Sequence, residues 1–378
     1  MKHLLFVLSA FAVTLSAVQA LENTTCKTCH PKIFAEYSRS MHAHASTVRD
    51  AVHRAVWEKH PLKQKGTYTC AQCHTPSDHT LSNGKGVPTD NAVQRTEPIS
   101  CQGCHRIESI EKHAKANRNI LTDKPKSFYS ADPKRKGEKV IFREESRLFG
   151  LITHTTGSPY HDIDYSNEAY YDGKMCMGCH SHKQNSRGFA ICDLEVKQGE
   201  SNATCMSCHM PQTSGAVANQ KRTATHAWHG ASIHGSTPKH LGKYVALTLQ
   251  PQAKGFTVTI ANKATHTLFP HPLRQGQLRV TIVQDGKLIA LPPRTFARVI
   301  GTDGKPSMPW LADRVIRDTT IKAGEKRTVT FDAVLKKGDE VMVEFGYYLV
   351  RPANAKALGL EGTPAEEFIV LKQKRFVF

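Results

Sequence analysis

The pattern of hydrophobic and polar positions divides the chain into three parts. Residues 4–18 form a nearly unbroken apolar run. Residues 21–242 are rich in His, Cys, Gly, Ser and Asn and contain few long apolar runs. After residue 243, short apolar segments are separated by turn residues, which is the pattern of β-strands. We therefore expect a leader, a middle region without an ordinary aliphatic core, and a β-region.

The leader has the features of a cleavable signal peptide. Lys2 and His3 precede the apolar run, and the small-residue exit Val18-Gln19-Ala20 follows it, which predicts cleavage after Ala20. A retained anchor is the alternative, but the run is shorter than the roughly 20 residues that cross a bilayer. The mature chain contains no segment long and apolar enough to span a membrane. We expect an exported protein, periplasmic or secreted, with no transmembrane segment.

The β-region predicts an antiparallel sandwich of immunoglobulin-like type. Turn sequences such as Asp285-Gly286-Lys287 separate several of its apolar runs. The predicted domains are the signal peptide 1–20, a middle domain 21–242 and the sandwich 243–378. The expected strands are Tyr244–Gln250, Phe256–Asn262, Gln277–Gln284, Arg327–Val334, Glu340–Val350 and Glu367–Phe378.

Within the middle region, one helix is predicted from Lys32 to Lys59, entered at Pro31 and stopped before Pro61. Apolar residues recur along it at three- and four-residue steps and so share a face. The basic stretch Asp123–Glu145 is expected to be a solvated loop, with a partner-docking loop as the alternative. The middle region is therefore expected to be mainly helical and irregular.

Ten of the eleven cysteines fall into five copies of C-x-x-C-H. Two thiols one helical turn apart can form thioethers with the two vinyl groups of haem, and the adjacent histidine can ligate the iron. Zinc ribbons, iron–sulfur sites and thioredoxin-like pairs also use C-x-x-C, but none requires a histidine after every second cysteine. The motifs predict five covalent c-type haems at Cys26/Cys29/His30, Cys70/Cys73/His74, Cys101/Cys104/His105, Cys176/Cys179/His180 and Cys205/Cys208/His209.

Five haems change how the remaining composition is interpreted. The porphyrins, wrapped by short helices and loops, are expected to form the core of the middle region. The formal charge of +18 would suggest a nucleic-acid or anionic-surface binder, but about ten propionates offset much of it. An acidic redox partner is still possible, whereas nucleic acid is improbable for an exported chain. The eleventh cysteine, Cys192, is expected to be a buried thiol.

The sixth ligands of the irons come from fifteen other histidines in the mature chain. A second axial histidine makes the iron six-coordinate and suits electron transfer, whereas an open position would allow chemistry. His79 and His182 lie too close to the motif histidines His74 and His180 to reach the opposite face of those haems, although His182 could serve a neighbouring haem. Helical periodicity alone slightly favours His44 over His42 as a ligand.

The middle region resembles the multihaem cytochrome c family that includes the tetrahaem cytochrome of the hydroxylamine-oxidation pathway. Glu36-Tyr37-Ser38-Arg39-Ser40-Met41-His42-Ala43 is similar to that family's aromatic-x-x-Ser-x-His-Ala element, although Tyr37 stands where Trp is commoner. In the family this histidine is typically a distal ligand. The resemblance therefore implies His42 as a sixth ligand.

Four further histidines are suggested by less specific likenesses. His113 follows the third motif, as a ligating histidine does in the family. The alternative is that His113 is an exposed histidine on a helix. His161 and His229 lie beside aromatic and small residues. They are preferred as ligands to His154 and His226, respectively, which are kept as alternatives. His266 lies in a loop that resembles the Asn-x-x-x-His-x-x-Pro loop found where a β-sandwich follows a multihaem region. It could ligate an iron, bind a propionate or be a plain loop histidine.

The expected function is electron transfer between exported or membrane-bound redox partner proteins. The alternative is an enzyme that reduces or oxidises a small nitrogen or sulfur compound at one open haem. Against an enzyme, every motif ends in histidine, and the chain lacks the eight motifs of hydroxylamine oxidoreductases. A third hypothesis makes the β-region a partner-binding module. The chain carries no nucleophile elbow, Walker loop or zincin helix.

Overall fold

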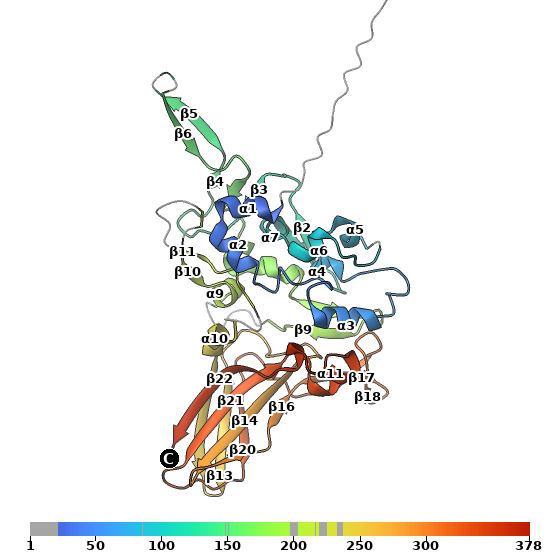
Figure 1. Cartoon of the computed structure of the whole chain (residues 1–378), viewed down its shortest axis with the longest axis vertical. Helices are drawn as coiled ribbons and strands as arrows, with labels where there is room; N and C mark the ends of the chain where they lie inside the picture. Colours follow the sequence, from blue (N-terminus) through green and yellow to red (C-terminus); the bar gives the residue numbers. More distant parts are fainter. Residues whose placement is uncertain are drawn as a thin grey trace, which may run out of the picture.

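The computed structural model describes residues 22–84, 86–147, 149, 151–196, 203–215, 217–218, 225–232 and 237–378. The expected signal peptide lies outside the described residues. The region that carries the motifs forms one end of the molecule, and long strands form the other end (Figure 1). No helix in the described part of the chain has the length and apolar character that crossing a membrane requires.

Short helices carry the C-x-x-C-H motifs. A helical turn brings residues three positions apart onto one side, so both thiols of each motif face the same way. Polar residues begin two of these helices: Ser100 accepts a hydrogen bond from the Gly103 N–H, and Thr204 forms a reciprocal pair of bonds with Ser207. The motif helices are α1 (Asn23–Cys29), α4 (Ala71–His74), α7 (Cys101–His105), the 3₁₀ helix η1 (Lys174–Gly178) and α9 (Cys205–His209).

The single helix predicted from Lys32 to Lys59 is wrong, because the structure divides it. Helix α2 (Pro31–Tyr37) ends early, and α3 (Ala51–Lys59) begins after turns, with Asp50 as its N-cap. Serines in the intervening segment make other bonds: Ser40 accepts from the Ala43 N–H, and Ser46 donates to the Gln94 carbonyl at 2.6 Å. Such side-chain bonds compete with a continuous helix.

Small sheets fill the rest of the motif region. The predicted loop Asp123–Glu145 contains strands, so this prediction is only partly right. Two of its strands, β3 (Ser127–Tyr129) and β4 (Lys139–Val140), flank β7 (Asp162–Asp164). The other small strands are β1 (Ile107–Glu111), β2 (Arg118–Leu121), β5 (Arg143–Arg147), β6 (Ile152–Thr156), β8 (His182–Gln184), β9 (Ala190–Asp193), β10 (Gln212–Ser214) and β11 (Thr225–Ala227). The β5–β6 hairpin projects away from the body (Figure 1).

Short helices complete the motif region and its junction with the β-region. They are α5 (His79–Ser82), α6 (Ala92–Thr96), α8 (Ala169–Asp172), α10 (Thr237–Leu241) and the 3₁₀ helix η2 (Gly242–Tyr244).

The β-region consists of antiparallel sheets, and all six predicted strands are present with boundaries shifted by a few residues. One sheet has the order β12 (Val245–Gln252), β13 (Gly255–Asn262), β20 (Lys326–Phe331). A second joins β14 (Gln275–Gln284), β21 (Glu340–Tyr348) and β22 (Ile369–Val377) to the edge strands β15 (Lys287–Ala290) and β16 (Arg294–Phe296). One buried cluster contains residues of both sheets, including Val258, Leu278 and Val343.

The remaining elements of the β-region were not predicted. A third sheet is formed by β17 (Arg298–Thr302), β18 (Lys305–Pro306) and β19 (Arg314–Asp318), and α11 (Pro352–Leu358) and η3 (Pro364–Glu366) precede the last strand. Their apolar positions are too few to give a clear period. The immunoglobulin-like arrangement itself stays a prediction.

Specific bonds join the β-region to the motif region. The Asn185 side chain donates to the carbonyls of Pro309 and Ala312 at 2.9 and 2.7 Å. The Thr267 hydroxyl donates to Glu195 at 3.0 Å. The α11 segment also forms a buried cluster against which Val52 and Val56 of α3 pack. The two regions therefore share polar and apolar contacts, which fixes residues of one against the motifs of the other.

Candidate functional site

The five motifs converge in the structure, and their thiols show which motifs are neighbours. The Cys26 and Cys101 side chains are within hydrogen-bonding reach of each other, which joins the first and third motifs. The pairs Cys73–Cys179 and Cys176–Cys205 likewise join the second motif to the fourth and the fourth to the fifth. Cys104 also interacts electrostatically with both thiols of the fourth motif. The fourth motif thus adjoins the second, third and fifth.

The second thiol of the fifth motif, Cys208, lies at the junction with the β-region. It follows Cys205 by one turn of α9, as two thioether bonds to one porphyrin require. None of the described thiol contacts joins Cys208 to another motif. Its thiol lies within hydrogen-bonding reach of the Tyr244 hydroxyl and, together with burial, raises the pKa of Tyr244 to about 12. The Cys208 carbonyl lies 3.0 Å from Nε2 of His240. Residues that lead into the β-region therefore hold this end of the motif.

The described cysteines form no disulfide, so the ten motif thiols are available for thioether bonds. Cys192, which was expected to be buried, is half-buried on β9. Burial is the main cause that raises the pKa of its thiol, so the group is protonated at neutral pH.

Three motif histidines have one ring nitrogen directed at a backbone carbonyl. Nδ1 of His30 lies 2.5 Å from the Val217 oxygen, that of His105 lies 2.8 Å from Tyr129, and that of His74 lies 3.2 Å from Ala45. When Nδ1 donates its proton to a carbonyl, Nε2 keeps a lone pair. Histidines that bind metals usually show this arrangement, because the second bond fixes the tautomer and the ring orientation.

Four motif histidines each face a second histidine from a distant part of the chain. Two imidazoles that bind one metal ion from opposite sides, each at about 2 Å, hold their ring centroids about 6 Å apart. The observed centroid distances are 6.2 Å for His30–His161, 6.1 Å for His42–His180, 6.4 Å for His105–His229 and 6.2 Å for His209–His266. The donor atoms and the ring spacing therefore fit haem iron at these four motifs.

Burial lowers the pKa of several of the paired histidines and so favours the neutral form, which ligates a metal. Burial and the neighbouring His180 lower the pKa of His42 to about 4. Burial and His105 lower the pKa of His229 to about 3, and burial and His266 lower that of His209 to about 4. At neutral pH these rings carry no charge, so their nitrogens are available to a metal.

The second motif differs from the other four. His53 lies beside His74 with a centroid distance of 4.0 Å, which is too short to place a metal ion between two ligating rings. Its nitrogens are engaged elsewhere, with Nδ1 2.9 Å from the Ala45 oxygen and Nε2 3.0 Å from the Tyr68 hydroxyl. His271 also lies near His74, since His74 contributes to lowering the pKa of His271 to about 3, after burial and Arg274.

Sequence reasoning missed His271. The residue follows His266 in the same loop, between Pro270 and Pro272. Two flanking prolines restrict the backbone and present the side chain from a rigid turn. That pattern is a usable signal, but by itself it does not indicate which motif the histidine would approach.

The structure brings four of the five suggested distal histidines to a motif histidine, namely His42, His161, His229 and His266. The fifth, His113, is exposed, and its Nδ1 accepts a hydrogen bond from the Lys115 N–H. None of the described ring contacts joins His113 to a motif histidine. Its position gives no support to the suggested role as a ligand.

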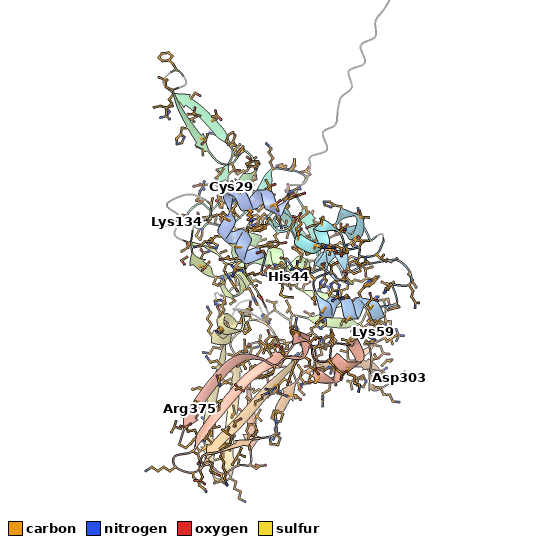
Figure 2. All side chains as sticks on the ribbon, in the orientation of Figure 1. Cys29, His44, Lys59, Lys134, Asp303 and Arg375 are labelled. Atoms are coloured by element: carbon orange, nitrogen blue, oxygen red, sulfur yellow. The ribbon has the colours of Figure 1, made fainter. Side chains whose placement is uncertain are left out.

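The competing histidines make other contacts. Both ring nitrogens of His44 are bonded, Nδ1 to the Ser40 carbonyl and Nε2 to Arg49. Figure 2 shows His44 among the helices of the motif region. His226 is buried and lies 3.1 Å from Glu36, whose other oxygen accepts the His229 backbone N–H. His154 is exposed on β6. His226 therefore positions the segment of His229 and is unavailable as a ligand.

The comparisons with known proteins agree with this site. Residues 25–106, which contain the first three motifs, match the family described as cytochrome c554 and c-prime. The part of the chain that carries the first three motifs is therefore similar to that family. The fold of the chain is similar to the crystal structure of a penta-heme cytochrome c552 from Thermochromatium tepidum. The TM-score is 0.70 at 20% identity, over 95% of this chain and 99% of that chain. No curated protein matches the sequence.

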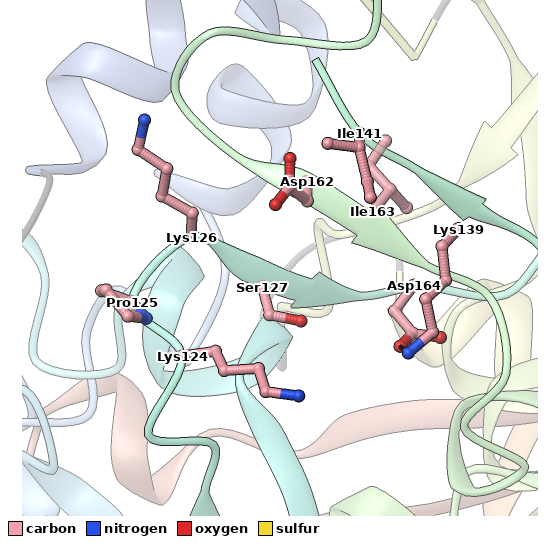
Figure 3. A pocket seen from close by; sticks show the side chains of 9 residues that line it. All are labelled: Lys124, Pro125, Lys126, Ser127, Lys139, Ile141, Asp162, Ile163 and Asp164. Atoms are coloured by element: carbon pink, nitrogen blue, oxygen red, sulfur yellow. Dashed lines mark ion pairs between the residues drawn. The ribbon is translucent and has the colours of Figure 1, made fainter. Parts of the chain in front are cut away.

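The residues that follow His161 in sequence, Asp162–Asp164, help to line a pocket of about 470 Å³ (Figure 3). The strands β3, β4 and β7 line it, with the side chains of Lys124, Lys126 and Lys139 among its walls. Lys139 is paired with Asp164 at 2.8 Å, whereas Lys126 extends away from Asp164 in the figure. The rim therefore has a positive side next to a candidate haem ligand.

Proposed function

We propose that this cytochrome binds five covalent c-type haems and transfers electrons between redox partner proteins outside the cytoplasm. The observation that carries the proposal is the recurrence of one spacing, 6.1 to 6.4 Å between ring centroids, in four histidine pairs. One such pair could arise from ordinary packing, whereas four pairs at four motifs indicate a common ligand between the rings. When bound, each haem supplies an iron that accepts and returns one electron. The signal peptide and an exported location form part of the same proposal.

The chain's own residues hold the irons and set their properties. The two cysteines of each motif, from Cys26 and Cys29 of the first to Cys205 and Cys208 of the fifth, anchor the porphyrins. The proximal ligands are His30, His74, His105, His180 and His209. We assign His161, His42, His229 and His266 as sixth ligands of the first, fourth, third and fifth haems. The carbonyls that accept from Nδ1 raise the basicity of the ligands. Histidine on both sides gives a low-spin iron suited to electron transfer.

The neighbouring motifs support a connected arrangement of cofactors. The thiol contacts relate the first motif to the third, the third to the fourth, and the fourth to both the second and the fifth. The fourth motif is therefore a branch point, from which two routes are available. This favours a carrier with more than one exit for electrons. The structurally similar cytochrome c552 is a penta-heme protein, which supports the number of cofactors.

We also propose that residues 243–378 form an immunoglobulin-like sandwich domain. Its support is the single buried cluster between the two larger sheets, which is how a sandwich core is built. In this proposal the domain completes haem sites through its His266 loop. The sandwich is then part of the electron-transfer unit, in addition to any role in binding partners.

The proposed partner is an acidic redox protein. Lys124 and Lys126 present positive charge at the pocket beside His161, where a partner would approach the first haem. Opposite charges steer such encounters and raise the association rate. Nucleic acid is not proposed, because the excess of basic residues is largely offset by haem propionates.

Mass and spin state test this function. The mature chain is produced in a host competent for cytochrome maturation, and its intact mass is compared with that of a chain carrying five porphyrins. We expect five adducts and a ferric spectrum dominated by low-spin iron. A mass without adducts would refute the proposal. A high-spin iron that responds to nitrite or sulfite would instead favour the reductase or oxidase alternative.

A further inference from the structure

At the second motif, none of the described ring pairs has the spacing seen at the other four motifs. His53 is the nearest histidine, but it contacts the same Ala45 carbonyl as the motif histidine His74. Because both rings direct Nδ1 at the same carbonyl, His53 and His74 lie on the same side of an iron that His74 would ligate. A sixth ligand must approach from the opposite side. His53 therefore supports the proximal ligand and cannot complete the coordination.

His271 has the geometry that His53 lacks. The Leu273 N–H donates to its Nδ1 at 3.2 Å, and its carbonyl accepts from the Arg274 N–H at 2.9 Å, so a tight turn fixes the residue. These bonds occupy Nδ1 and leave Nε2 for another partner. The orientation of the imidazole is thus determined by the backbone of its own turn.

Packing brings this turn to the second motif. Leu273 belongs to the apolar group that packs against the α11 cluster, together with Val52 and Val56 of α3. The Leu273 carbonyl also accepts the Arg351 N–H at 2.8 Å. Helix α3 carries His53, which lies against His74. Helix α3 and the turn of His271 therefore pack against the same α11 cluster, and α3 also places His53 against His74.

The other described histidines are committed elsewhere or lie at the surface. His182 and His240 direct Nε2 at backbone carbonyls, and the His60 ring packs against Trp57 and Trp310. His79, His113 and His154 are exposed. His234 lies outside the described residues. Two half-buried histidines near the second motif have no described partner at Nε2, His60 and His271. Of these, His271 interacts electrostatically with His74, whereas the His60 ring is held between the two tryptophans.

The half-buried guanidinium of Arg274, three residues after His271, provides further support. Burial lowers the pKa of Arg274, and the Tyr347 and Asp50 side chains counteract only part of this effect. No carboxylate among the described residues forms an ion pair with Arg274. A partly desolvated cation favours a carboxylate as its counterion. A haem propionate at the second motif would provide that counterion.

We propose that His271 is the sixth ligand of the iron at the second motif, and that Arg274 binds a propionate of the same haem. The inference rests on the proposed function, because it requires a haem at Cys70 and Cys73. One loop of the β-region then completes two haem sites, with His266 serving the fifth motif and His271 the second. Through this loop the β-region would supply the sixth ligand of both irons and so influence their reduction potentials.

Electron paramagnetic resonance of the ferric, full-length mature protein tests the proposal. The variants are H271A, H53A and, as a matched control, H44A, whose histidine has both ring nitrogens bonded within its own segment. Intact mass is measured first on every sample and must show five haems. In the wild-type protein all irons should be low-spin. In H271A one iron in five should become high-spin, and added imidazole should restore the low-spin signal.

The outcomes distinguish this inference from the proposed function. A wild-type mass without haems refutes the proposed function itself. With five haems present, the inference is overturned if the wild type already contains a high-spin iron, if H271A stays fully low-spin, or if H53A gives the high-spin signal. H44A should match the wild type. Should H271A lose a haem, H271M decides: one histidine–methionine iron in near-infrared magnetic circular dichroism supports the inference, and none overturns it.

Discussion

The two regions of this protein differ in the interactions that stabilise them. The β-region has a continuous cluster of fully buried aliphatic and aromatic side chains between its sheets. The motif region has only small clusters, such as Trp57, Tyr68, Ala71 and Leu81. Its helices are about one or two turns long, and isolated helices of that length are unstable in water. The comparison indicates that apolar burial stabilises one region, whereas covalent cofactors stabilise the other.

The largest effect should follow from removing a cofactor at the centre of the motif region. In the variant C176A/C179A, the fourth haem is lost, and its neighbours at the second, third and fifth motifs lose their packing surface. We expect the free energy of unfolding of the motif region to fall by at least about 3–5 kcal/mol, which is the cost of removing a single buried aromatic side chain. Limited proteolysis followed by mass spectrometry should locate the cleavage in residues 22–242.

The control for this prediction is C192A, which removes the cysteine outside the motifs. It should keep five haems and resist proteolysis like the wild type. Rapid cleavage of the β-region in C176A/C179A would contradict the comparison, because that region has a core of its own.

The converse change is a cavity in the β-region. Phe345 is fully buried on β21, and Phe345→Ala should lower the free energy of unfolding by about 3–5 kcal/mol. Thermal unfolding followed by circular dichroism of the strands should shift to lower temperature while five haems stay attached. Leu288→Ala, at a side chain that is 76% exposed, is the control and should change little. Equal effects of the two changes would contradict a packed core here.

A smaller effect is expected at a polar network of the motif region. Asp78 accepts hydrogen bonds from Asn91, Gln94 and the Leu81 N–H. Burial acts to raise the pKa of Asp78, but these bonds outweigh it and lower the pKa below its ordinary value. Asp78→Asn should cost about 1–3 kcal/mol at neutral pH.

The sign of the pH dependence follows from that lowered pKa. The contribution of Asp78 is present above the pKa of the unfolded chain and is lost as the pH falls through the lower folded value. Denaturant unfolding from pH 7 to 3 should therefore show the wild type and the variant converging at acid pH. A difference that grows toward acid pH would refute the assignment. Asp303→Asn, on an exposed turn, is the control.

The smallest effect concerns the surface at the pocket beside His161. The double variant K124E/K126E removes positive charge there without touching a buried residue. Reduction by anionic dithionite should slow by about 2- to 10-fold at low salt, whereas reduction by a neutral photoreduced flavin should not change. Lys254→Glu, on an exposed turn of the β-region, should have no such effect. Equal slowing with both reductants would contradict electrostatic steering.

Local signals determined much of this protein from sequence alone. The five C-x-x-C-H motifs need only a few adjacent residues, so their positions and chemistry were readable directly. The six predicted strands are present because two-residue periodicity and turn residues act over short distances. The family likeness around Glu36–Ala43 pointed to His42, where periodicity alone had favoured His44.

Only the tertiary structure decided which distant residues meet. Ser46 bonds to Gln94 across 48 residues, and such bonds help to divide the helix that periodicity predicted as continuous. His161 reaches His30, and His266 reaches His209, through contacts that no local pattern encodes. His271 was missed for the same reason: its two prolines indicate a rigid turn, but its place beside His74 depends on how α3 packs against the β-region. Local chemistry fixes what a side chain can bind, and long-range packing fixes what it meets.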